Sequence, residues 1–313
     1  MGLGTSEVLD VMNEDVALVF PGQGSQSLTM LDDFVSKDKQ LVIDICQIAS
    51  DILGYDMYEL CTIDSANKLN NTIYTQPALL VVGYIAWQLT RFKENVRYLA
   101  GHSLGEYTAL VCANALEFTE ALTLVSKRGA LMQQAVPTGS GVMAAILGLD
   151  TNAVSQICLK VAQSLQQVVA CANLNAPGQI VIAGTVAAVN EAMRECVSHG
   201  AKRTMLLNVS VPSHCMLMHS AAQEFMHDLK NINWQIPNIP VVQNYTANAT
   251  NDVATIIDSL AKQLYSPVRW IESIEYLIDH DVTKIIEAGP GKVLTGLNKR
   301  IAANLSCITL GEV

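Results

Sequence analysis

The pattern of apolar and polar positions predicts parallel strands alternating with helices in the N-terminal part of the chain. Val16–Phe20 is apolar at every position and ends at a Pro-Gly turn, which is typical of a strand buried on both faces of a parallel sheet. Helical spacing follows in Leu41–Leu53 and Pro77–Arg91. A second short strand, Val96–Ala100, leads into a glycine-flanked turn and an apolar helix that begins at Glu106.

The pattern changes from residue 141 onward, where short strands and two helices alternate. The order strand, helix, strand, strand, helix, strand is the ferredoxin-like unit. The predicted elements of this unit are Val142–Leu149, Thr151–Leu165, Val168–Asn173, Ile180–Ala183, Val186–His199 and Lys202–Val209. Two further strands are expected beyond the unit, at Val241–Asn244 and Lys284–Ile286.

The chain is interpreted as two domains and a short extension. We expect residues 139–209 to form the small domain, inserted between the two halves, 16–138 and 210–313, of a larger α/β domain with a parallel sheet. Residues 1–15 are expected to be a disordered N-terminal extension.

Composition and charge exclude several function classes. Hydrophobic residues make up 50% of the 313 positions and charged residues only 15%, which indicates a large buried core rather than disorder. The net charge is −10 and no run of Lys and Arg occurs, so nucleic-acid binding is not expected. The longest uncharged apolar stretch, Pro77–Thr90, is too short to span a bilayer, and Met1–Val16 does not have the features of a secretory signal.

The eight cysteines are scattered, and none stands in CxxC or another close metal-ligand spacing. We interpret them as free thiols of a cytoplasmic protein and expect no metal site. Their positions are Cys46, Cys61, Cys112, Cys158, Cys171, Cys196, Cys215 and Cys307.

Gly101-His102-Ser103-Leu104-Gly105 fits the pattern G-x-S-x-G of the nucleophile elbow. The glycines allow a sharp turn that exposes the Ser103 hydroxyl, and the following helix N-terminus offers N–H groups to a developing oxyanion. The alternative is that Ser103 only caps the helix.

A serine nucleophile needs a base, and His214 is the strongest candidate among the six histidines. It follows Val211-Pro212-Ser213 at a strand-to-helix junction, where a nearby helix start would bias the imidazole towards its neutral form. The alternative is a helix-terminal residue with no catalytic role. The others are interpreted as packing, helix-terminal, surface or core residues: His102, His199, His219, His227 and His280.

The carboxylate of a Ser-His-acid triad is missing from its expected place between Ser103 and His214. The only aspartate there is Asp150, which is expected to cap a helix, and the glutamates at 106, 117, 120, 191 and 195 are expected in helices. This counts against an ordinary esterase and suggests that a neutral acceptor orients the imidazole.

Arg128 lies on the apolar stripe of its predicted helix, residues 120–135, whereas Lys127 points elsewhere. A buried guanidinium is costly unless it meets an anion. Two interpretations follow: an ion pair with a distant Asp or Glu, or a bidentate clamp for a substrate carboxylate.

Eight motifs in order resemble the malonyl-CoA:acyl carrier protein transacylases of bacterial type II fatty acid synthesis. They cover nearly the whole chain from Val16. The motifs are PGQGSQ (21–26), TQPAL (75–79), GHSLGEYTAL (101–110), KRGALMQ (127–133), NAPGQIVIAG (175–184), VPSH (211–214), QLYSPVRW (263–270) and EAGPGKVL (287–294).

The resemblance implies a role for each matching residue. Ser103 would be the nucleophile and His214 the base, with the imidazole oriented by the main-chain carbonyl of Gln263. The remaining roles implied are an oxyanion hole from the N–H groups of Gln23 and Leu104 and a site for the malonyl carboxylate at Arg128.

The family resemblance also implies a fold and a reaction. The fold would be an α/β-hydrolase-like large domain with a ferredoxin-like insertion. The reaction would be malonyl transfer from malonyl-CoA to the phosphopantetheine thiol of acyl carrier protein, by a ping-pong route through malonyl-serine and without a cofactor. We expect a cytoplasmic monomer.

Three other functions remain open at this point. A free-standing acyltransferase that serves a polyketide synthase would use the same residues. A hydrolase is disfavoured by Arg128 and by the absent acid. A non-catalytic scaffold that docks carrier protein would need neither Ser103 nor His214.

The acidic balance is confined to the N-terminal part of the chain. Residues 1–66 contain 12 acidic and 2 basic residues, whereas residues 67–313 contain 17 of each. The neutral remainder can therefore present local basic patches that attract an acidic carrier protein. The candidates are Lys202-Arg203, Lys292 and Lys299-Arg300.

Overall fold

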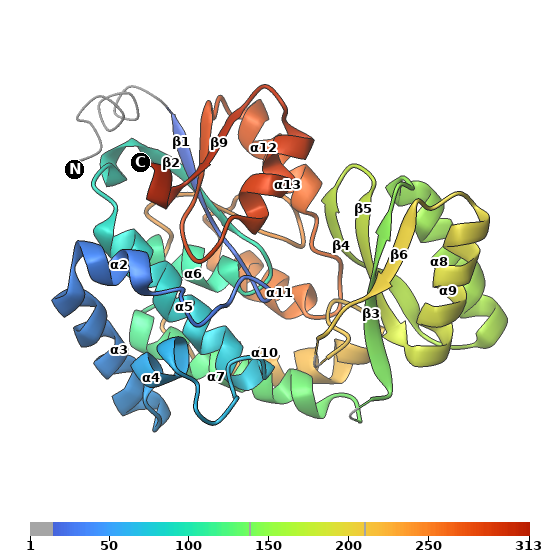
Figure 1. Ribbon diagram of the computed structural model, residues 1–313, viewed down its shortest axis with the longest axis horizontal. Coiled ribbons are helices and arrows are strands. Elements are labelled where there is room, and N and C mark those ends of the chain that lie inside the picture. Colours follow the sequence, from blue (N-terminus) through green and yellow to red (C-terminus); the bar gives the residue numbers. More distant parts are fainter. Residues whose placement is uncertain (1–14, 138, 210) are drawn as a thin grey trace.

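The structure is a computed structural model, and it describes residues 15–137, 139–209 and 211–313. Two sheets lie in separate parts of the molecule (Figure 1). The larger part is built on a five-stranded sheet in the order β7-β2-β1-β8-β9, and all four strand pairs are parallel. Its strands are β1 (Val16–Phe20), β2 (Val96–Gly101), β7 (Val241–Val242), β8 (Lys284–Glu287) and β9 (Ser306–Thr309).

Strand β1 lies in the middle of the parallel sheet, as its uninterrupted apolar run predicted. All five of its residues are buried. Val16, Leu18 and Phe20 pack into the core on one face of the sheet, whereas Ala17 and Val19 pack into the core on the other. Burial on both faces explains why the strand shows no alternation of apolar and polar residues.

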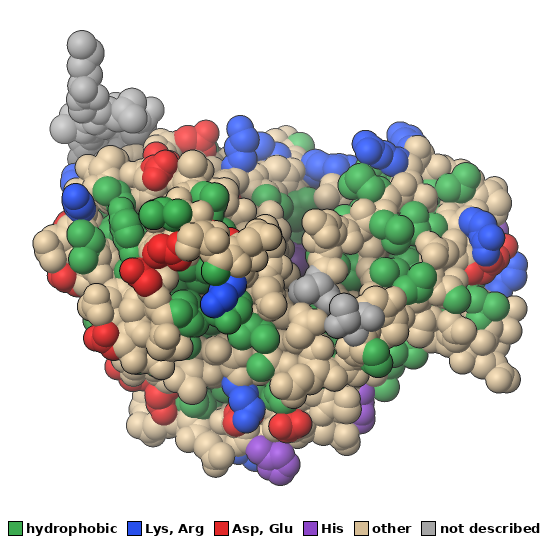
Figure 2. Space-filling view, turned by 60° about the horizontal axis from the view of Figure 1, so that its bottom comes forward, with side chains coloured by type: hydrophobic (Ala, Val, Ile, Leu, Met, Phe, Trp, Pro, Cys, Tyr) green, Lys and Arg blue, Asp and Glu red, His purple; other side chains and the backbone are tan. Residues whose placement is uncertain are grey.

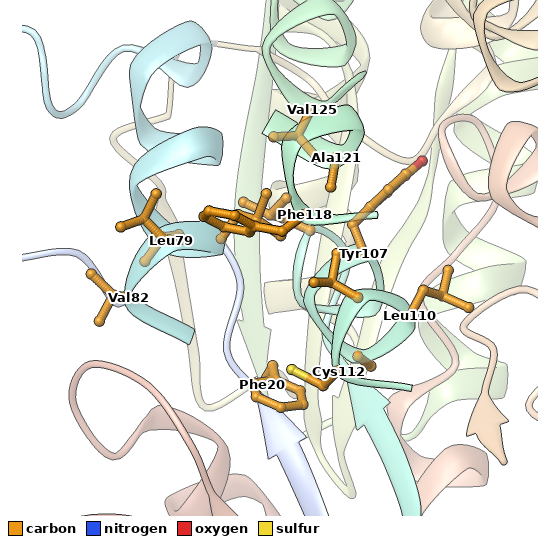
Figure 3. Packing of buried hydrophobic residues seen from close by; sticks show 14 of the residues in the cluster. Phe20, Leu79, Val82, Tyr107, Leu110, Cys112, Phe118, Ala121 and Val125 are labelled. Carbon is orange, nitrogen blue, oxygen red and sulfur yellow. The ribbon is translucent and has the colours of Figure 1, made fainter. Parts of the chain in front are cut away.

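Helices cover both faces of this sheet. The core on one face contains side chains of α3, α5, α6, α7, α10 and α11, and the core on the other contains side chains of α12 and α13. Figure 3 shows part of the first core, where Phe20, Leu79, Tyr107 and Phe118 lie among aliphatic side chains. The helices of this part are α2 (Asp32–Lys37), α3 (Lys39–Leu53), α4 (Met57–Thr62), α5 (Thr72–Leu89), α6 (Gly105–Cys112), α7 (Phe118–Gln134), α10 (His219–Lys230), α11 (Val253–Gln263), α12 (Trp270–Asp279) and α13 (Val293–Ile301), with short 3₁₀ turns at Lys93–Asn95, Met216–Met218 and Leu310–Glu312.

Helix α5 begins at Thr72, five residues before the predicted start at Pro77. The side chain of Asn71 caps it by accepting a hydrogen bond from the Ile73 N–H, 3.1 Å away. The first turns were not recognised because they carry polar residues, among them the buried Gln76. These polar side chains lie at the candidate site described below.

The smaller part contains a four-stranded antiparallel sheet in the order β4-β5-β3-β6, covered by two helices. The predicted order of strands and helices is confirmed, as is the predicted cap of α8, where the Asp150 side chain accepts from the Ala153 N–H at 2.8 Å. The elements are β3 (Gly141–Leu147), α8 (Thr151–Leu165), β4 (Val169–Ala176), β5 (Gln179–Thr185), α9 (Val186–Ser198) and β6 (Arg203–Leu206).

Two predicted strands are shorter than expected. Strand β6 ends at Leu206 rather than Val209, because the chain turns there towards the candidate site, which Leu207 and Val209 line. Strand β7 ends at Val242, and Asn244 is instead bound to the nucleophile elbow.

The predicted extension covers residues 1–14, which lie outside the described residues, and Asp15. Asp15 is held in place: its carboxylate accepts a hydrogen bond from Arg97 Nε at 2.8 Å, and its carbonyl accepts one from the Thr283 N–H at 3.0 Å. Within the described ranges, no helix has both the length and the apolar character needed to cross a membrane.

Candidate active site

A cavity of about 100 Å³ lies between the two parts of the molecule. Figure 2 shows the surface hollowed there, with a histidine side chain inside the hollow and Lys and Arg side chains along its upper rim. Its apolar wall contains Met132, Met143, Leu207, Val209 and Val211. Five of the six predicted site residues line it, namely Gln23, Ser103, Leu104, Arg128 and His214, and the sixth, Gln263, contacts both His214 and Arg128.

The Ser103 turn is a strained strand-to-helix connection. Ser103 has a φ of 53°, in the left-handed region. A Cβ on Gly105 would lie 2.0 Å from the Phe20 carbonyl oxygen, so only glycine allows the turn to pack against β1. The Asn244 side chain braces the turn, since its Oδ1 accepts from the Ser103 N–H at 2.6 Å and its Nδ2 donates to the Gly101 carbonyl at 2.7 Å.

The alternative role of Ser103 as a helix cap is wrong. No side chain of the described residues caps the first turn of helix α6. The Ser103 hydroxyl instead lies 2.8 Å from His214 Nε2 and accepts a hydrogen bond from Arg128 Nη2 at 3.2 Å.

His214 is oriented by a backbone carbonyl. Its Nδ1 lies 2.7 Å from the carbonyl oxygen of Gln263, which can only accept a hydrogen bond, so Nδ1 carries the proton. Nε2 is then free to accept from the Ser103 hydroxyl. The Gln263 carbonyl thus binds the imidazole nitrogen that the acid of a triad would bind.

Burial, and next the Arg128 charge, lowers the pKa of His214 from 6.5 to about 3. The predicted bias towards the neutral imidazole therefore holds in direction, but its cause is different. Helix α10 begins only at His219, so a helix N-terminus is not the reason.

The lowered pKa of His214 leads to a prediction for solution. Because the folded-state value lies below the ordinary one, the imidazole should stay neutral, with its proton on Nδ1, from pH 8 down to about pH 5. ¹⁵N NMR of histidine-labelled protein would follow this titration, and the spectrum of His214→Ala would assign the signal. A midpoint near 6.5 for that signal would contradict the prediction.

Gln23 and Leu104 both line the cavity, and their N–H groups have no acceptor among the described residues. The next two amides, of Gly105 and Glu106, are already bonded to carbonyl oxygens of the turn. Gly22 brings the Gln23 loop close, because a Cβ there would lie 2.4 Å from the His102 carbonyl oxygen. Two free donors beside the nucleophile are the arrangement that an oxyanion requires.

Arg128 is 1% exposed on α7, as its place on the apolar stripe predicted. Its Nη1 donates to Gln76 Oε1 at 2.7 Å, and its Nη2 donates to Gln263 Oε1 at 2.9 Å. Arg128 forms no ion pair with any residue of the described ranges, so the interpretation as half of a buried ion pair is wrong. Its charge lies beside the Ser103 hydroxyl, at the cavity.

Sequence reasoning missed three polar residues that build this site: Gln76, Glu106 and Asn244. Glu106 was assigned only to a helix, yet it is fully buried, and its Oε2 accepts from the Asn244 N–H at 3.0 Å and from Gln263 Nε2 at 2.7 Å. A charged residue in the first turn of an otherwise apolar helix was the available signal.

The remaining predicted side chains lie as expected. His102 points to Asn175, with Nε2 2.9 Å from Oδ1, and packs on Trp270. All eight cysteines are free thiols. In the part of the chain that the structure describes, no group of three or more His, Cys, Asp or Glu side chains could hold a metal ion.

Comparison with known proteins agrees with the geometry. The acyl transferase domain family matches residues 17–303. The chain is 46% identical over 300 residues to the malonyl CoA-acyl carrier protein transacylase of Haemophilus influenzae, with 95% of each protein covered. It is also 46% identical over 299 residues to that of Escherichia coli, covering 95% of this chain and 96% of the relative.

Solved structures show the same likeness. An acyl carrier protein S-malonyltransferase from Vibrio cholerae has a TM-score of 0.90 at 46% identity, over 94% of this chain and 96% of that one. A malonyl-transacylase in complex with a type II PKS acyl-carrier protein has a TM-score of 0.89 at 44% identity, over 94% of each chain. The protein is thus an acyltransferase. Within that class, the chain belongs to the malonyl-CoA:acyl carrier protein transacylase family.

Proposed function

We propose that the protein transfers the malonyl group of malonyl-CoA to the phosphopantetheine thiol of acyl carrier protein and so supplies fatty acid synthesis. One observation carries the proposal: the Ser103 hydroxyl lies 2.8 Å from His214 Nε2 and 3.2 Å from the Arg128 guanidinium. A nucleophile, its base and a cation for a free carboxylate therefore meet at one cavity. The names of the relatives support the same substrates.

In the first half-reaction, His214 Nε2 takes the proton of Ser103 while Oγ attacks the thioester carbon. The Gln263 carbonyl stabilises the imidazolium through Nδ1–H. The N–H groups of Gln23 and Leu104 donate to the oxyanion. The C–S bond then breaks, His214 returns its proton to the CoA sulfur, and malonyl-Ser103 remains.

In the second half-reaction, the thiol of the carrier protein's phosphopantetheine enters the same cavity. His214 takes the thiol proton, and the sulfur attacks the ester carbonyl of malonyl-Ser103. Collapse of the second oxyanion breaks the C–O bond, and the proton passes to Ser103 Oγ. Arg128 holds the malonyl carboxylate throughout, and no cofactor takes part in either step.

Intact-mass spectrometry after incubation with malonyl-CoA tests the proposal. We expect one malonyl group on the wild-type protein, its removal by added holo carrier protein, and no adduct on Ser103→Ala. Removal by water at the same rate would indicate a hydrolase. An undiminished adduct on Ser103→Ala would refute the assignment of the nucleophile.

We also propose that the larger part, residues 16–138 and 210–313, is an α/β-hydrolase-like domain and that residues 139–209 are a ferredoxin-like insertion. The strand orders of the two sheets support this division. Met143 on β3 and the segment after β6 complete the cavity wall, so the insertion would enclose the acyl group.

Exposed basic side chains in both parts of the molecule suggest how an acidic carrier protein approaches. Lys202 and Arg203 at the start of β6 are exposed, as are Lys292, Lys299 and Arg300 at the two ends of α13. Figure 2 shows Lys and Arg side chains along the upper rim of the hollow.

Charge reversal on this rim should weaken carrier-protein recognition. For Lys202→Glu combined with Lys299→Glu we expect the KM for carrier protein to rise about tenfold at low salt, and the difference to shrink as salt screens the attraction. The rate of Ser103 malonylation by malonyl-CoA should not change. Lys39→Glu on α3 is the matched control, and an equal rise in KM for that variant would contradict the docking surface.

A second candidate function is transfer to the carrier protein of a type II polyketide synthase. The relative that is solved in complex with a type II PKS acyl-carrier protein favours it. Parallel assays with carrier proteins of both kinds would separate the two candidates. We expect the enzyme to act as a cytoplasmic monomer in either case.

A further inference from the structure

Three buried side chains from three helices form one hydrogen-bonded chain behind the nucleophile. Arg128 Nη2 on α7 donates to Gln263 Oε1 at 2.9 Å, and Gln263 Nε2, at the end of α11, donates to Glu106 Oε2 on α6 at 2.7 Å. None of the three is more than 1% exposed. A neutral amide therefore links a buried cation to a buried carboxyl group.

The direction of this amide is fixed by its partners. Arg128 can only donate, so the atom facing it must be the amide oxygen. Gln263 Nε2 also donates to the Ser103 carbonyl at 3.0 Å, and this acceptor confirms which end is the nitrogen. The amide dipole thus runs from the guanidinium to the carboxyl group, and a reversed amide would lose all three hydrogen bonds.

The charges of Arg128 and Glu106 stabilise each other, because each group is buried. Neither forms a direct ion pair within the described residues, and an isolated charge in the interior is costly. The other groups around Glu106 are Tyr107 on its own helix, the Asn244 N–H and the Gln263 side-chain amide. Arg128 is thus the only cation of the described residues in this cluster.

The carboxyl group of Glu106 can gain or lose a proton near neutral pH. Burial raises its pKa to about 7, opposed by the hydrogen bonds from Asn244 and Gln263 and by the charge of Arg128. Its second oxygen, Oε1, is buried and has no hydrogen-bond partner in the described part of the chain. Oε1 can therefore carry a proton without breaking either bond to Oε2.

We propose that Glu106 is a positioning residue that supplies the counter-charge of Arg128 in the free enzyme, through the Gln263 amide, and takes up a proton from solvent when a substrate carboxylate binds Arg128. This inference rests on the proposed function, because it requires an acyl group with a free carboxylate. Exchange of one anion for another keeps the cluster near neutrality in both states. Gln263 stays fixed throughout, so its carbonyl continues to orient His214.

Calorimetric titration of Ser103→Ala, which binds without reacting, tests the proposal. Titration at pH 7.5 in buffers of different ionisation enthalpy measures protons taken up on binding. The carboxylate raises the pKa of Glu106 further, so malonyl-CoA should add uptake of up to about one proton relative to acetyl-CoA. In Ser103→Ala/Glu106→Gln this extra uptake should vanish, and malonyl-CoA should bind at least about fivefold more tightly, because no protein anion then competes for Arg128.

Glu287→Gln in the Ser103→Ala background is the matched control. Glu287 is also a buried carboxyl group, but it accepts from the N–H groups of Leu294 and Thr295, away from Arg128. This control should keep the extra proton uptake. Equal proton uptake for malonyl-CoA and acetyl-CoA in Ser103→Ala would overturn the proposal, and this outcome needs no substitution at Glu106. Extra proton uptake that persists in Ser103→Ala/Glu106→Gln would overturn it too. So would failure of malonyl-CoA to bind to that double variant. Loss of the malonyl-Ser103 adduct in the wild-type protein would instead refute the proposed function.

Discussion

Replacement of His214 by alanine should lower kcat for malonyl transfer by roughly 10⁴- to 10⁶-fold, the range seen when the base of a serine nucleophile is removed. Among the described residues, the Ser103 hydroxyl has no other base within hydrogen-bond distance, since its second partner is the Arg128 guanidinium, which only donates. Steady-state transfer from malonyl-CoA to holo carrier protein would measure the loss.

Two controls separate loss of the base from loss of the fold. His199→Ala, at the exposed C-terminal end of α9, should leave kcat within about twofold and match any general effect of removing an imidazole. Imidazole added to His214→Ala should restore part of the activity in a concentration-dependent way, which a misfolded site would not allow. A loss of less than tenfold with an intact thermal transition would assign the base to another group.

The elements that local sequence determines were predicted closely. Strand β1 and helix α8 have the predicted bounds, because an unbroken apolar run and an Asp150 cap are signals carried by neighbouring residues. The elbow was predicted from a pattern of neighbouring residues. Gly101 is required by contact with Gly105 inside the turn, whereas Gly105 is required by contact with Phe20 on β1. Local patterns thus placed Ser103 correctly on a turn between a strand and a helix.

The polar residues that surround the nucleophile could not be predicted from local patterns. Gln76, Glu106 and Asn244 come from α5, α6 and the turn after β7, and their partners lie 52, 157 and 141 positions away in the chain. Such residues resemble ordinary helix or loop residues until the fold brings them together. The start of α5 was missed because its first turns are polar, and one of these polar residues, Gln76, binds Arg128.

Gln263 contacts the candidate site through both its backbone and its side chain. Its carbonyl oxygen binds His214 Nδ1 and its side chain binds Arg128 and Glu106, so one residue orients the base and bridges the charges. A carboxylate bound directly to His214 would raise the imidazole pKa and would compete with the substrate for the nearby Arg128. A neutral acceptor avoids both effects, which would suit the proposed reaction, since a malonyl group brings its own carboxylate.

Arg128→Ala should exchange malonyl specificity for acetyl transfer. We expect kcat/KM for malonyl-CoA to fall by about 10³- to 10⁴-fold, because the substrate carboxylate would enter the site with no cation to meet it. Transfer from acetyl-CoA, which carries no carboxylate, should stay within about tenfold of wild type or rise. Parallel measurements of kcat/KM for the two thioesters give the ratio directly.

Two further variants at Arg128 show whether charge or shape sets this preference. Arg128→Met fills much of the same volume without charge and should show the same change of preference as Arg128→Ala. Arg128→Lys keeps the charge but not the two-nitrogen fork that reaches Gln76 and Gln263, so it should recover only part of the malonyl activity. Equal losses for malonyl and acetyl transfer in Arg128→Met would mean that the guanidinium serves the fold alone. A loss of malonyl transfer alone would mean that the substrate carboxylate is the anion that pairs with Arg128. This pairing would explain why the protein keeps a buried cation that has no ion-pair partner of its own.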